Sequence, residues 1–334
     1  MHDRGLAIWL LACCALVFAM VVVGGITRLT HSGLSIVEWQ PIVGTLPPLD
    51  DKAWQEAFRK YQQTPEFRQV NPDIELAGFK RIFWWEYAHR LLGRTIGAAF
   101  LLPLLWFAAR GRIARHLGWK LAAIFALGGL QGAMGWYMVQ SGLVDDPRVS
   151  QYRLTAHLGI ALLIYAAMLW IALDLLVPRG NETAPRALRR FAFAVVALVF
   201  AMAISGAFVA GIRAGLAYNT FPLMNGYLVP PGMFVIEPWY LNFFNNIATV
   251  QFDHRAIAWL LAILVPWFWV RVRPAPAPPR ARLAADLLLA ALALQIALGI
   301  ATLLNTVPVP LAAAHQAGAL LVFTAAMLAL HSLR

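Results

Sequence analysis

The segment 191–212 reads FAFAVVALVFAMAISGAFVAGI and contains no charged residue. A helix rises about 1.5 Å per residue, so about 20 apolar residues cross the hydrocarbon core of a bilayer. Stretches 6–26, 121–139 and 309–330 are equally free of charge, and four more carry ionisable residues: 91–109, 154–177, 247–270 and 283–304. We therefore predict an all-α integral membrane protein with eight transmembrane helices.

The composition agrees with this prediction. Hydrophobic residues make up 60% of the 334-residue chain and charged residues 13%, whereas soluble domains carry about 25% charged residues. The apolar stretch 6–26 is longer than the core of a signal peptide, so we expect a retained helix. Cys13 and Cys14 are adjacent inside it, and neighbouring cysteines rarely meet disulfide geometry. We expect them to act as small apolar residues.

Charge predicts the orientation in the membrane. The two termini and the loops 110–120, 174–190 and 271–286 together hold 14 basic and four acidic residues. The opposite loops hold 12 of each. By the positive-inside rule, both termini face the cytoplasmic side of the cell (inner) membrane. The net charge of +11 therefore reflects topology, and we expect no nucleic-acid partner.

Four histidines lie at the outer ends of four alternate predicted spans: His89, His157, His254 and His315. An ionisable ring at membrane depth is costly, so its default interpretation is functional. AHLG at 156–159 matches AHQAG at 314–318, and the His-Arg pair at 89–90 matches the one at 254–255. The histidines therefore form one pair in each half of the chain.

Other matches extend this internal repeat. SGLS at 32–35 corresponds to AGLA at 214–217, and Gln131 with Gly135 corresponds to Gln295 with Gly299. We predict two tandem four-helix bundles, 1–177 with a long outer loop and 191–334, joined by a cytoplasmic linker at 178–190. Tandem repeats of this kind occur in membrane folds.

The first outer loop, residues 27–90, contains an amphipathic segment. Asp50 or Asp51 can cap a helix that places Trp54, Ala57, Phe58 and Tyr61 on one face, and Pro65 would stop it. We expect this helix to lie at the membrane surface over the outer mouth of the bundle, either as a plain interfacial helix or as a lid.

Two histidines on facing helices of one bundle suit the iron of haem, because a bundle builds cofactor sites from inward side chains. Small residues on the intervening helices either leave room for a porphyrin or serve close helix contacts: Gly128, Gly129, Gly132, Gly135 and Gly299. Zinc and di-iron sites fit worse, because the second half offers only two histidines and a glutamine. The remaining histidines have no counterpart in the repeat and are expected at the surface: His2, His31, His116 and His331.

The two halves differ three residues before the first histidine of each pair, where Glu86 corresponds to Gln251. Residues three apart share a helix face. A carboxylate beside one site is typical of a general base or a cation stabiliser, so we assign His89 and His157 to a substrate and the other pair to a fixed cofactor. Alternatively, Glu86 pairs with Lys80, Arg81 or Arg90. Arg90 and Arg255 hold haem propionates or anchor helix ends at headgroups.

The chain resembles the haem A synthase family over nearly its whole length. The resemblance rests on GGITRLTHSGLS at 24–35, WQP at 39–41, Gly44, PP at 47–48, FKRIFWWEYAHR at 79–90 and the three further histidines. It implies an eight-helix tandem repeat that oxidises a methyl group of haem O to a formyl group, giving haem A for terminal oxidases.

The resemblance also implies roles for the site residues. His89 and His157 would flank the substrate haem, His254 and His315 would ligate haem b, and Glu86 would lie beside the reacting haem. Some members carry a cysteine pair in the first outer loop. This chain has none there and resembles the cysteine-free branch.

Two other functions stay open on the residues alone. One is a bis-haem electron carrier of the cytochrome b type, and the other is a haem-handling assembly factor. The partners expected for the enzyme are haem O, the lipid bilayer, haem O synthase, oxidase assembly factors and an unidentified electron acceptor.

Overall fold

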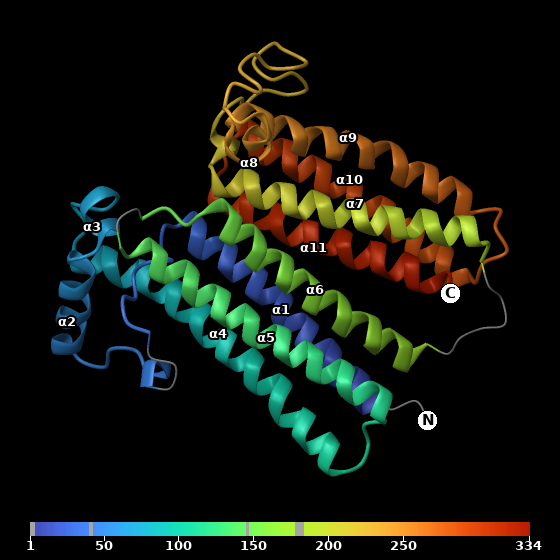
Figure 1. Cartoon of the computed structure of the whole chain (residues 1–334), viewed down its shortest axis with the longest axis horizontal. Helices are drawn as coiled ribbons and strands as arrows, with labels where there is room; N and C mark the ends of the chain where they lie inside the picture. The colour runs from blue at the N-terminus through green and yellow to red at the C-terminus, as the bar shows by residue number, and fades with distance from the viewer. Residues whose placement is uncertain (1–3, 40–42, 145–146, 178–183) are drawn as a thin grey trace. The chain divides into compact units, whose positions relative to one another are not determined.

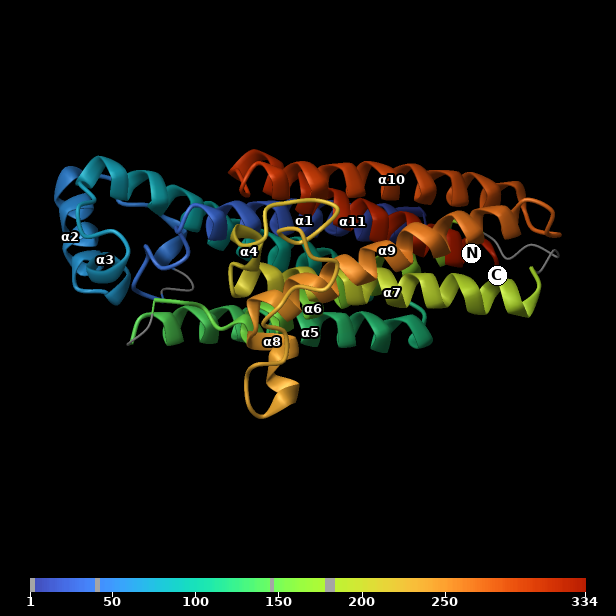
Figure 2. The same ribbon diagram turned by 90° about the horizontal axis from the view of Figure 1, so that it is seen from above.

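A computed structural model describes residues 4–39, 43–144, 147–177 and 184–334 (Figures 1 and 2). It confirms the all-α prediction, since the extended pairing among these residues is one isolated bridge between Met224 and Tyr227. Eight helices are long and apolar enough to cross a membrane: α1 (Arg4–Leu29), α4 (Leu76–Ala109), α5 (Arg115–Gly142), α6 (Gln151–Leu176), α7 (Arg186–Gly211), α9 (Ile247–Val272), α10 (Pro279–Leu304) and α11 (Val309–Ser332). The chain is a multi-pass membrane protein.

The helices satisfy their own backbone groups, as a bilayer requires. Asn246 precedes α9 and its side chain accepts hydrogen bonds from the amides of Ala248 and Thr249 at 2.9 and 3.1 Å. Pro103 lies inside α4 and Pro266 inside α9. Membrane helices tolerate an internal proline where neighbouring groups form hydrogen bonds with the backbone groups that it leaves unpaired. The start of α9 is therefore set by a capping side chain as well as by hydropathy.

The chain forms two compact units. One comprises Met1–Leu11 with Tyr165–Arg334 and is called here the 165–334 unit; the other, Ala12–Ile164, is called the 12–164 unit. Each boundary falls inside a helix, α1 or α6. The predicted domains 1–177 and 191–334 rest on the sequence repeat instead and stay a prediction. Of the predicted linker 178–190, residues 178–183 lie outside the described residues, and α7 begins at Arg186.

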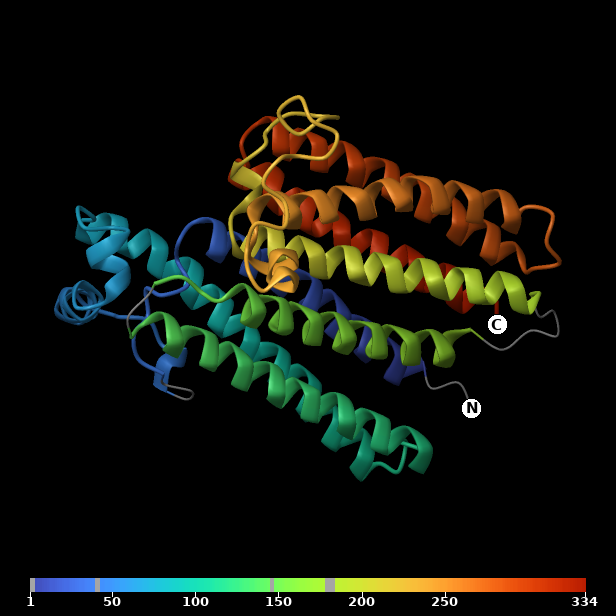
Figure 3. The ribbon, with the colours of Figure 1, turned by 45° about the horizontal axis from the view of Figure 1, so that its top comes forward.

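In the 165–334 unit, α7, α9, α10 and α11 run side by side in all three views (Figures 1 to 3). Their shared core holds Val265 and Leu288, both fully buried, with Phe268 at 1% exposure. At the end of α11 the side chain of His331 is 4% exposed. Its Nε2 lies 2.9 Å from an oxygen of Asp174, and its ring packs edge-on against Trp170.

The prediction that His331 is a surface residue is therefore wrong. The physical reason is that α6 and α11 pack together at this point, so a helix-end position that looks peripheral in the sequence is covered. His31 and His116 are exposed as expected, and His2 lies outside the described residues.

The 12–164 unit contains α4, α5, most of α1, the first half of α6 and two short helices, α2 (Asp51–Gln62) and α3 (Pro65–Gln69). Asp50 caps α2 as predicted, its side chain accepting from the amide of Ala53 at 2.7 Å. The apolar face of α2 also forms as predicted. It packs on the first turns of α4, where Trp54 lies 4.9 Å from Phe83 between ring centroids.

Tyr61 completes this aromatic cluster. Its ring is fully buried, 5.2 Å from Phe79, and Asn71 Nδ2 donates to its hydroxyl at 2.9 Å. Burial raises the pKa of Tyr61 to about 12, so the phenol stays neutral in any physiological solution. The cluster anchors α2 inside the protein and buries its apolar face. Burial of that face therefore does not require the expected position on the membrane surface.

Candidate functional site

The four histidines are positioned on four different long helices. His89 is on α4 and His157 on α6, both within the 12–164 unit. His254 is on α9 and His315 on α11, both within the 165–334 unit. All four rings are half-buried. His157 lies within electrostatic range of His89, and His315 within range of His254. The predicted pairs are thus brought together, one pair in each unit.

Each histidine ring lies against a glycine of a neighbouring helix. A Cβ atom added to Gly24 would come within 3.1 Å of His89 Nε2, and one added to Gly135 within 3.2 Å of His157 Cε1. In the other unit, the corresponding distances are 3.2 Å from Gly206 to His254 Cε1 and 2.8 Å from Gly299 to His315 Cε1. These separations are shorter than ordinary van der Waals contact. We call these glycines the glycine seats.

The glycine seats refine one sequence prediction. Gly135 and Gly299 were expected to leave room for a porphyrin or to serve a close helix contact, and they make room for an imidazole. An added Cβ at Gly128, Gly129 or Gly132 meets nothing within 4 Å. These three glycines of α5 therefore border open space.

The ring nitrogens have unequal partners. Ser205 Oγ lies 2.8 Å from His254 Nδ1, which leaves Nε2 of this ring available to a ligand. Gln131 Nε2 lies 3.3 Å from His157 Nε2. The Nδ1 atoms of His157 and His315 are buried without a hydrogen-bond partner among the described residues. Buried polar atoms without partners call for an explanation such as an absent ligand or water.

These observations fit haem better than a metal ion held by protein alone. No group of three or more histidine, cysteine, aspartate or glutamate side chains that could hold a metal ion occurs within residues 4–39, 43–144, 147–177 and 184–334. Each unit supplies two imidazoles, and a porphyrin supplies the other four ligands of a six-coordinate iron. Two half-buried rings without a third protein ligand therefore match the needs of a bis-histidine haem.

Glu86 is 2% exposed and makes four hydrogen bonds. One oxygen accepts from Ser35 Oγ and from the backbone amide of Ile36, both at 2.8 Å. The other accepts from Arg90 Nε at 3.0 Å and Nη2 at 2.6 Å. Arg90 also donates to the carbonyls of Ile36 and Glu38. The carboxylate therefore joins α4 to the segment that follows α1, and it pairs with Arg90, one of the partners that the sequence left open.

Gln251 occupies the corresponding place in the other unit, and it donates to its neighbouring loop where Glu86 accepts. Its Nε2 donates to the carbonyls of Ala214 and Ala217 at 2.6 and 3.3 Å, and its Oε1 accepts from Arg255 at 3.0 Å. Arg255 donates in turn to the carbonyl of Tyr218 at 2.7 Å. The loop beside Glu86 thus offers donors, and the loop beside Gln251 offers acceptors. The two arrangements are consistent with the internal repeat.

Sequence reasoning missed two kinds of residue. The roles of Arg90 and Arg255 at propionates or headgroups stay predictions, and the sequence did not show that both also hold the loop that follows the preceding long helix. Ser205 was not singled out at all. Aligning Gly24 with Gly206 on the repeat could have found it, because Ser205 and Val23 then become equivalent neighbours of the two seats.

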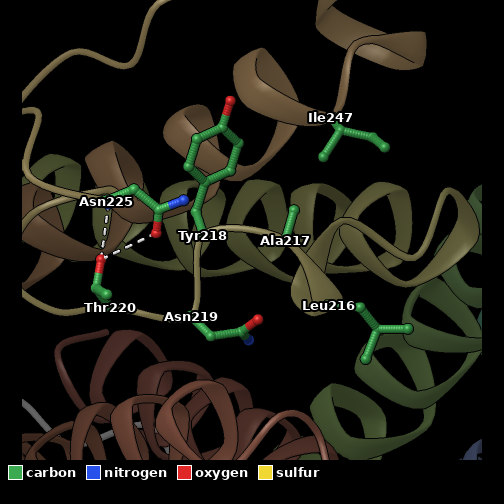
Figure 4. Close-up of a pocket in the computed structure, with 7 residues that line it drawn as sticks. All are labelled: Leu216, Ala217, Tyr218, Asn219, Thr220, Asn225 and Ile247. Atoms are coloured by element: carbon green, nitrogen blue, oxygen red, sulfur yellow. Dashed lines mark hydrogen bonds between the residues drawn. The ribbon is translucent and has the colours of Figure 1, made fainter.

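A pocket of about 710 Å³ opens in the 165–334 unit (Figure 4). It is lined by Leu216, Ala217, Tyr218, Asn219, Thr220, Asn225 and Ile247. The Thr220 hydroxyl accepts from the amide of Asn225 at 2.7 Å, as Figure 4 shows. The histidines do not line this pocket, so we assign it no part in haem binding.

Known proteins resemble this chain over nearly its whole length. The sequence is 64% identical to the heme A synthase of Nitrosospira multiformis, over 99% of this chain and 94% of the relative. It is 58% identical to that of Nitrosomonas eutropha over 98% and 93%, and 50% identical to that of Parvibaculum lavamentivorans over 99% and 95%. Residues 7–327 match the family described as cytochrome oxidase assembly protein, COX15-CtaA. The chain therefore belongs to the COX15-CtaA family of cytochrome oxidase assembly proteins.

Proposed function

We propose that this chain is a membrane oxidoreductase that converts haem O to haem A by oxidising a porphyrin methyl group to a formyl group. The observation that carries the proposal is the presence of two histidine pairs, one in each unit, each ring resting on a glycine seat. Relatives that are 50% to 64% identical over nearly the whole chain are named heme A synthase.

The two pairs receive different haems in this proposal. His89 and His157 hold haem O as substrate, and His254 and His315 hold haem b as a resident cofactor. When bound, haem b would supply one-electron redox chemistry. Two structural differences support the assignment. Ser205 fixes His254 through Nδ1, whereas the repeat places Val23, whose side chain has no polar atom, at the equivalent position before Gly24. The open space at Gly128, Gly129 and Gly132 belongs to the unit of the first pair.

Glu86 contributes its charge to the substrate site. Arg90 donates to one of its oxygens, and Ser35 and Ile36 donate to the other, so hydrogen bonds occupy both oxygens of the carboxylate. That arrangement suits a fixed negative charge that stabilises positive charge developing on the substrate. It suits a proton acceptor less, because accepting a proton would break a bond that the carboxylate already makes.

The location and the partners complete the proposal. Both termini face the cytoplasm of the cell (inner) membrane, because basic residues gather on that side of the predicted spans. Each predicted bundle, 1–177 and 191–334, serves one haem. The substrate comes from haem O synthase, the product goes to oxidase assembly factors, and the electron acceptor is a separate redox partner.

The test is the haem content of cells that make haem O synthase with or without this protein. Acid-extracted haems are analysed by liquid chromatography and mass spectrometry. Haem A is expected only in cells that contain the protein. If haem O stays unchanged while the purified protein carries two equally retained haems, the protein is an electron carrier and the proposal fails.

A Glu86→Gln variant tests the assigned charge. Glutamine is the residue of the matched position 251, and the side chain can keep a hydrogen bond to Arg90. Removing one preorganised charge-stabilising group typically lowers kcat by about 10²–10³-fold, so we expect haem A to fall at least a hundredfold while haem binding persists.

Ser35→Ala is the matched control, because it removes a hydrogen bond to Glu86 and leaves the charge in place. It should reduce haem A far less than Glu86→Gln does. If both variants lose haem A to the same extent, Glu86 serves only to hold the loop, and its charge does not contribute to the reaction.

A further inference from the structure

The connection from α7 to α9 is almost free of charge. Between Arg213 and Asp253, Glu237 is the single charged residue. The equivalent stretch of the other half, residues 32–87, contains 14 charged residues. A loop in water is normally rich in polar and charged side chains. The contrast between the two halves indicates that the two connections face different surroundings.

Apolar side chains of this connection point outward. Six of them form what we call the 228–240 surface, defined by Leu228, Val229, Phe234, Val235, Trp239 and Tyr240. Leu228 is 78% exposed, Val235 70% and Trp239 61%. Single exposed apolar residues are ordinary, but six of them within the thirteen residues 228–240 indicate a contact with something apolar.

Two asparagines of the same connection, Asn242 and Asn246, are buried. Asn242 is fully buried, and its Nδ2 donates to the carbonyls of Ile236 and Trp239 at 2.7 Å. The backbone amide of Ile236 donates back to Asn242 Oδ1 at 3.0 Å. Asn246 Nδ2 donates to the carbonyl of Gly232 at 2.8 Å. These backbone groups at Gly232, Ile236 and Trp239 are thus satisfied from within, which is what a segment in contact with lipid requires.

The position of the connection identifies the partner. The loop begins where α7 ends and stops where α9 begins, so both of its ends adjoin membrane-spanning helices. Trp239 and Tyr240 are of the residue types that favour the membrane–water interface. The near absence of charge leaves no means of steering a charged protein or a charged solute.

We propose that the 228–240 surface inserts into the bilayer interface at the end of the 165–334 unit where His254 lies. The partner is phospholipid: Leu228, Val229 and Val235 contact acyl chains, and Trp239 and Tyr240 lie at the level of the headgroups. Glu237 is exposed and stays in the headgroup water. The proposal does not depend on the proposed haem chemistry.

The test measures the depth of a fluorescent label in the full chain. Cys13 and Cys14 are buried and are replaced by alanine. Single variants Leu228→Cys and Val235→Cys are then labelled with an environment-sensitive nitrobenzoxadiazole probe. Gln55→Cys is the control, because Gln55 is exposed on α2 in the charged stretch of the other half. Each labelled protein is reconstituted into phosphatidylcholine vesicles, and a monodisperse elution profile confirms that it has folded.

Nitroxide-bearing lipid should quench labels 228 and 235 several-fold more than label 55, and their emission should shift to shorter wavelength. Aqueous iodide should show the reverse order. Quenching of labels 228 and 235 by iodide to the extent seen at 55 would mean a water-facing loop and overturn the proposal. Protection of both labels from lipid nitroxide and from iodide would mean a protein partner and overturn it equally.

Discussion

At the scale of the residue, the first histidines of the two pairs, His89 and His254, have different contacts. His254 receives a polar contact at Nδ1 from Ser205, while His89 turns Nε2 toward the backbone of Gly24. The partner of the second ring nitrogen fixes the tautomer and orientation of a metal-binding histidine. A resident cofactor benefits from such a fixed ring, and a haem that must leave as product does not.

We predict that Ser205→Val loosens the haem that we propose His254 holds. Loss of such a partner typically weakens metal binding about 10–100-fold, so the purified variant should retain less haem b. Its midpoint potential should rise, because the imidazole donates less electron density once the hydrogen bond to Nδ1 is gone. Haem content by pyridine haemochrome assay and a redox titration measure the two effects.

Ser205→Thr is the control, since it keeps the hydroxyl and should preserve both haem content and potential. Val23→Ser places a hydroxyl at the equivalent position of the other unit and should increase retention of haem O. If Ser205→Val leaves haem content and potential unchanged, the contact plays no part in holding the cofactor.

The sequence predicted the identity of these residues better than their contacts. The histidine pairs and the exchange of Glu86 for Gln251 are local or repeat-based patterns, which a single sequence displays. The partners of Glu86 are 50 and 51 residues away at Ile36 and Ser35. His331 was misplaced for the same reason, because its burial depends on where α6 packs. Long-range packing has no local signature in the sequence.

At the scale of the element, α5 differs from its counterpart α10 on one face. Gly128, Gly129 and Gly132 border open space, whereas the repeat places Leu292, Ala293 and Ile296 at the equivalent positions. Leu292 is 5% exposed and fills the interior of its own unit. The larger residues of α10 suit a site that holds its haem permanently.

We predict that Gly132→Ile closes part of the space used by the substrate. The added side chain meets no atom at its Cβ position, and isoleucine is compatible with a membrane helix, so the protein should fold. Conversion of haem O to haem A should fall about tenfold or more, while the haem b content stays unchanged. Haem analysis of the same cells measures both.

Gly118→Ala near the start of α5 is a suitable control, because its Cβ would meet only Ile113 at 3.6 Å. If Gly132→Ile produces haem A at the normal level, the face of α5 that carries these glycines contacts lipid and not the substrate.

Helix prediction succeeded where the apolar run and the helix coincide. The predicted span 191–212 corresponds to α7 at Arg186–Gly211. The span predicted at 91–109 belongs to a helix that begins at Leu76. Lys80, Arg81 and Glu86 interrupt the apolar run there, although they do not interrupt the helix. Hydropathy therefore reports the part of α4 inside the bilayer, and the packing of α2 supports the part outside it.

At the scale of the whole molecule, charge is distributed unevenly between the two sides of the predicted membrane. The side that carries 14 basic residues has four acidic ones. Two of these acids are neutralised within the protein, since Asp174 pairs with Arg334 and Asp286 with Arg273. The excess of basic residues on that side is the basis of the predicted orientation.

Reporter fusions test this orientation. We predict that alkaline phosphatase is inactive when fused after Arg112 or Arg334 and active when fused within the stretch 63–75, because phosphatase folds only outside the cytoplasm. Green fluorescent protein should give the opposite pattern. Active phosphatase after Arg334 would invert the topology and place the histidines on the cytoplasmic side.

The glycine seats have a consequence for how the protein responds to mechanical stress. A glycine has no side chain that could yield, so each imidazole rests on helix backbone. A change in the distance between the two helices therefore also moves the imidazole ring. Hydrostatic pressure or a thinner bilayer shifts both together. The optical and electron paramagnetic resonance spectra of a bound haem should then report helix spacing directly, with no label introduced.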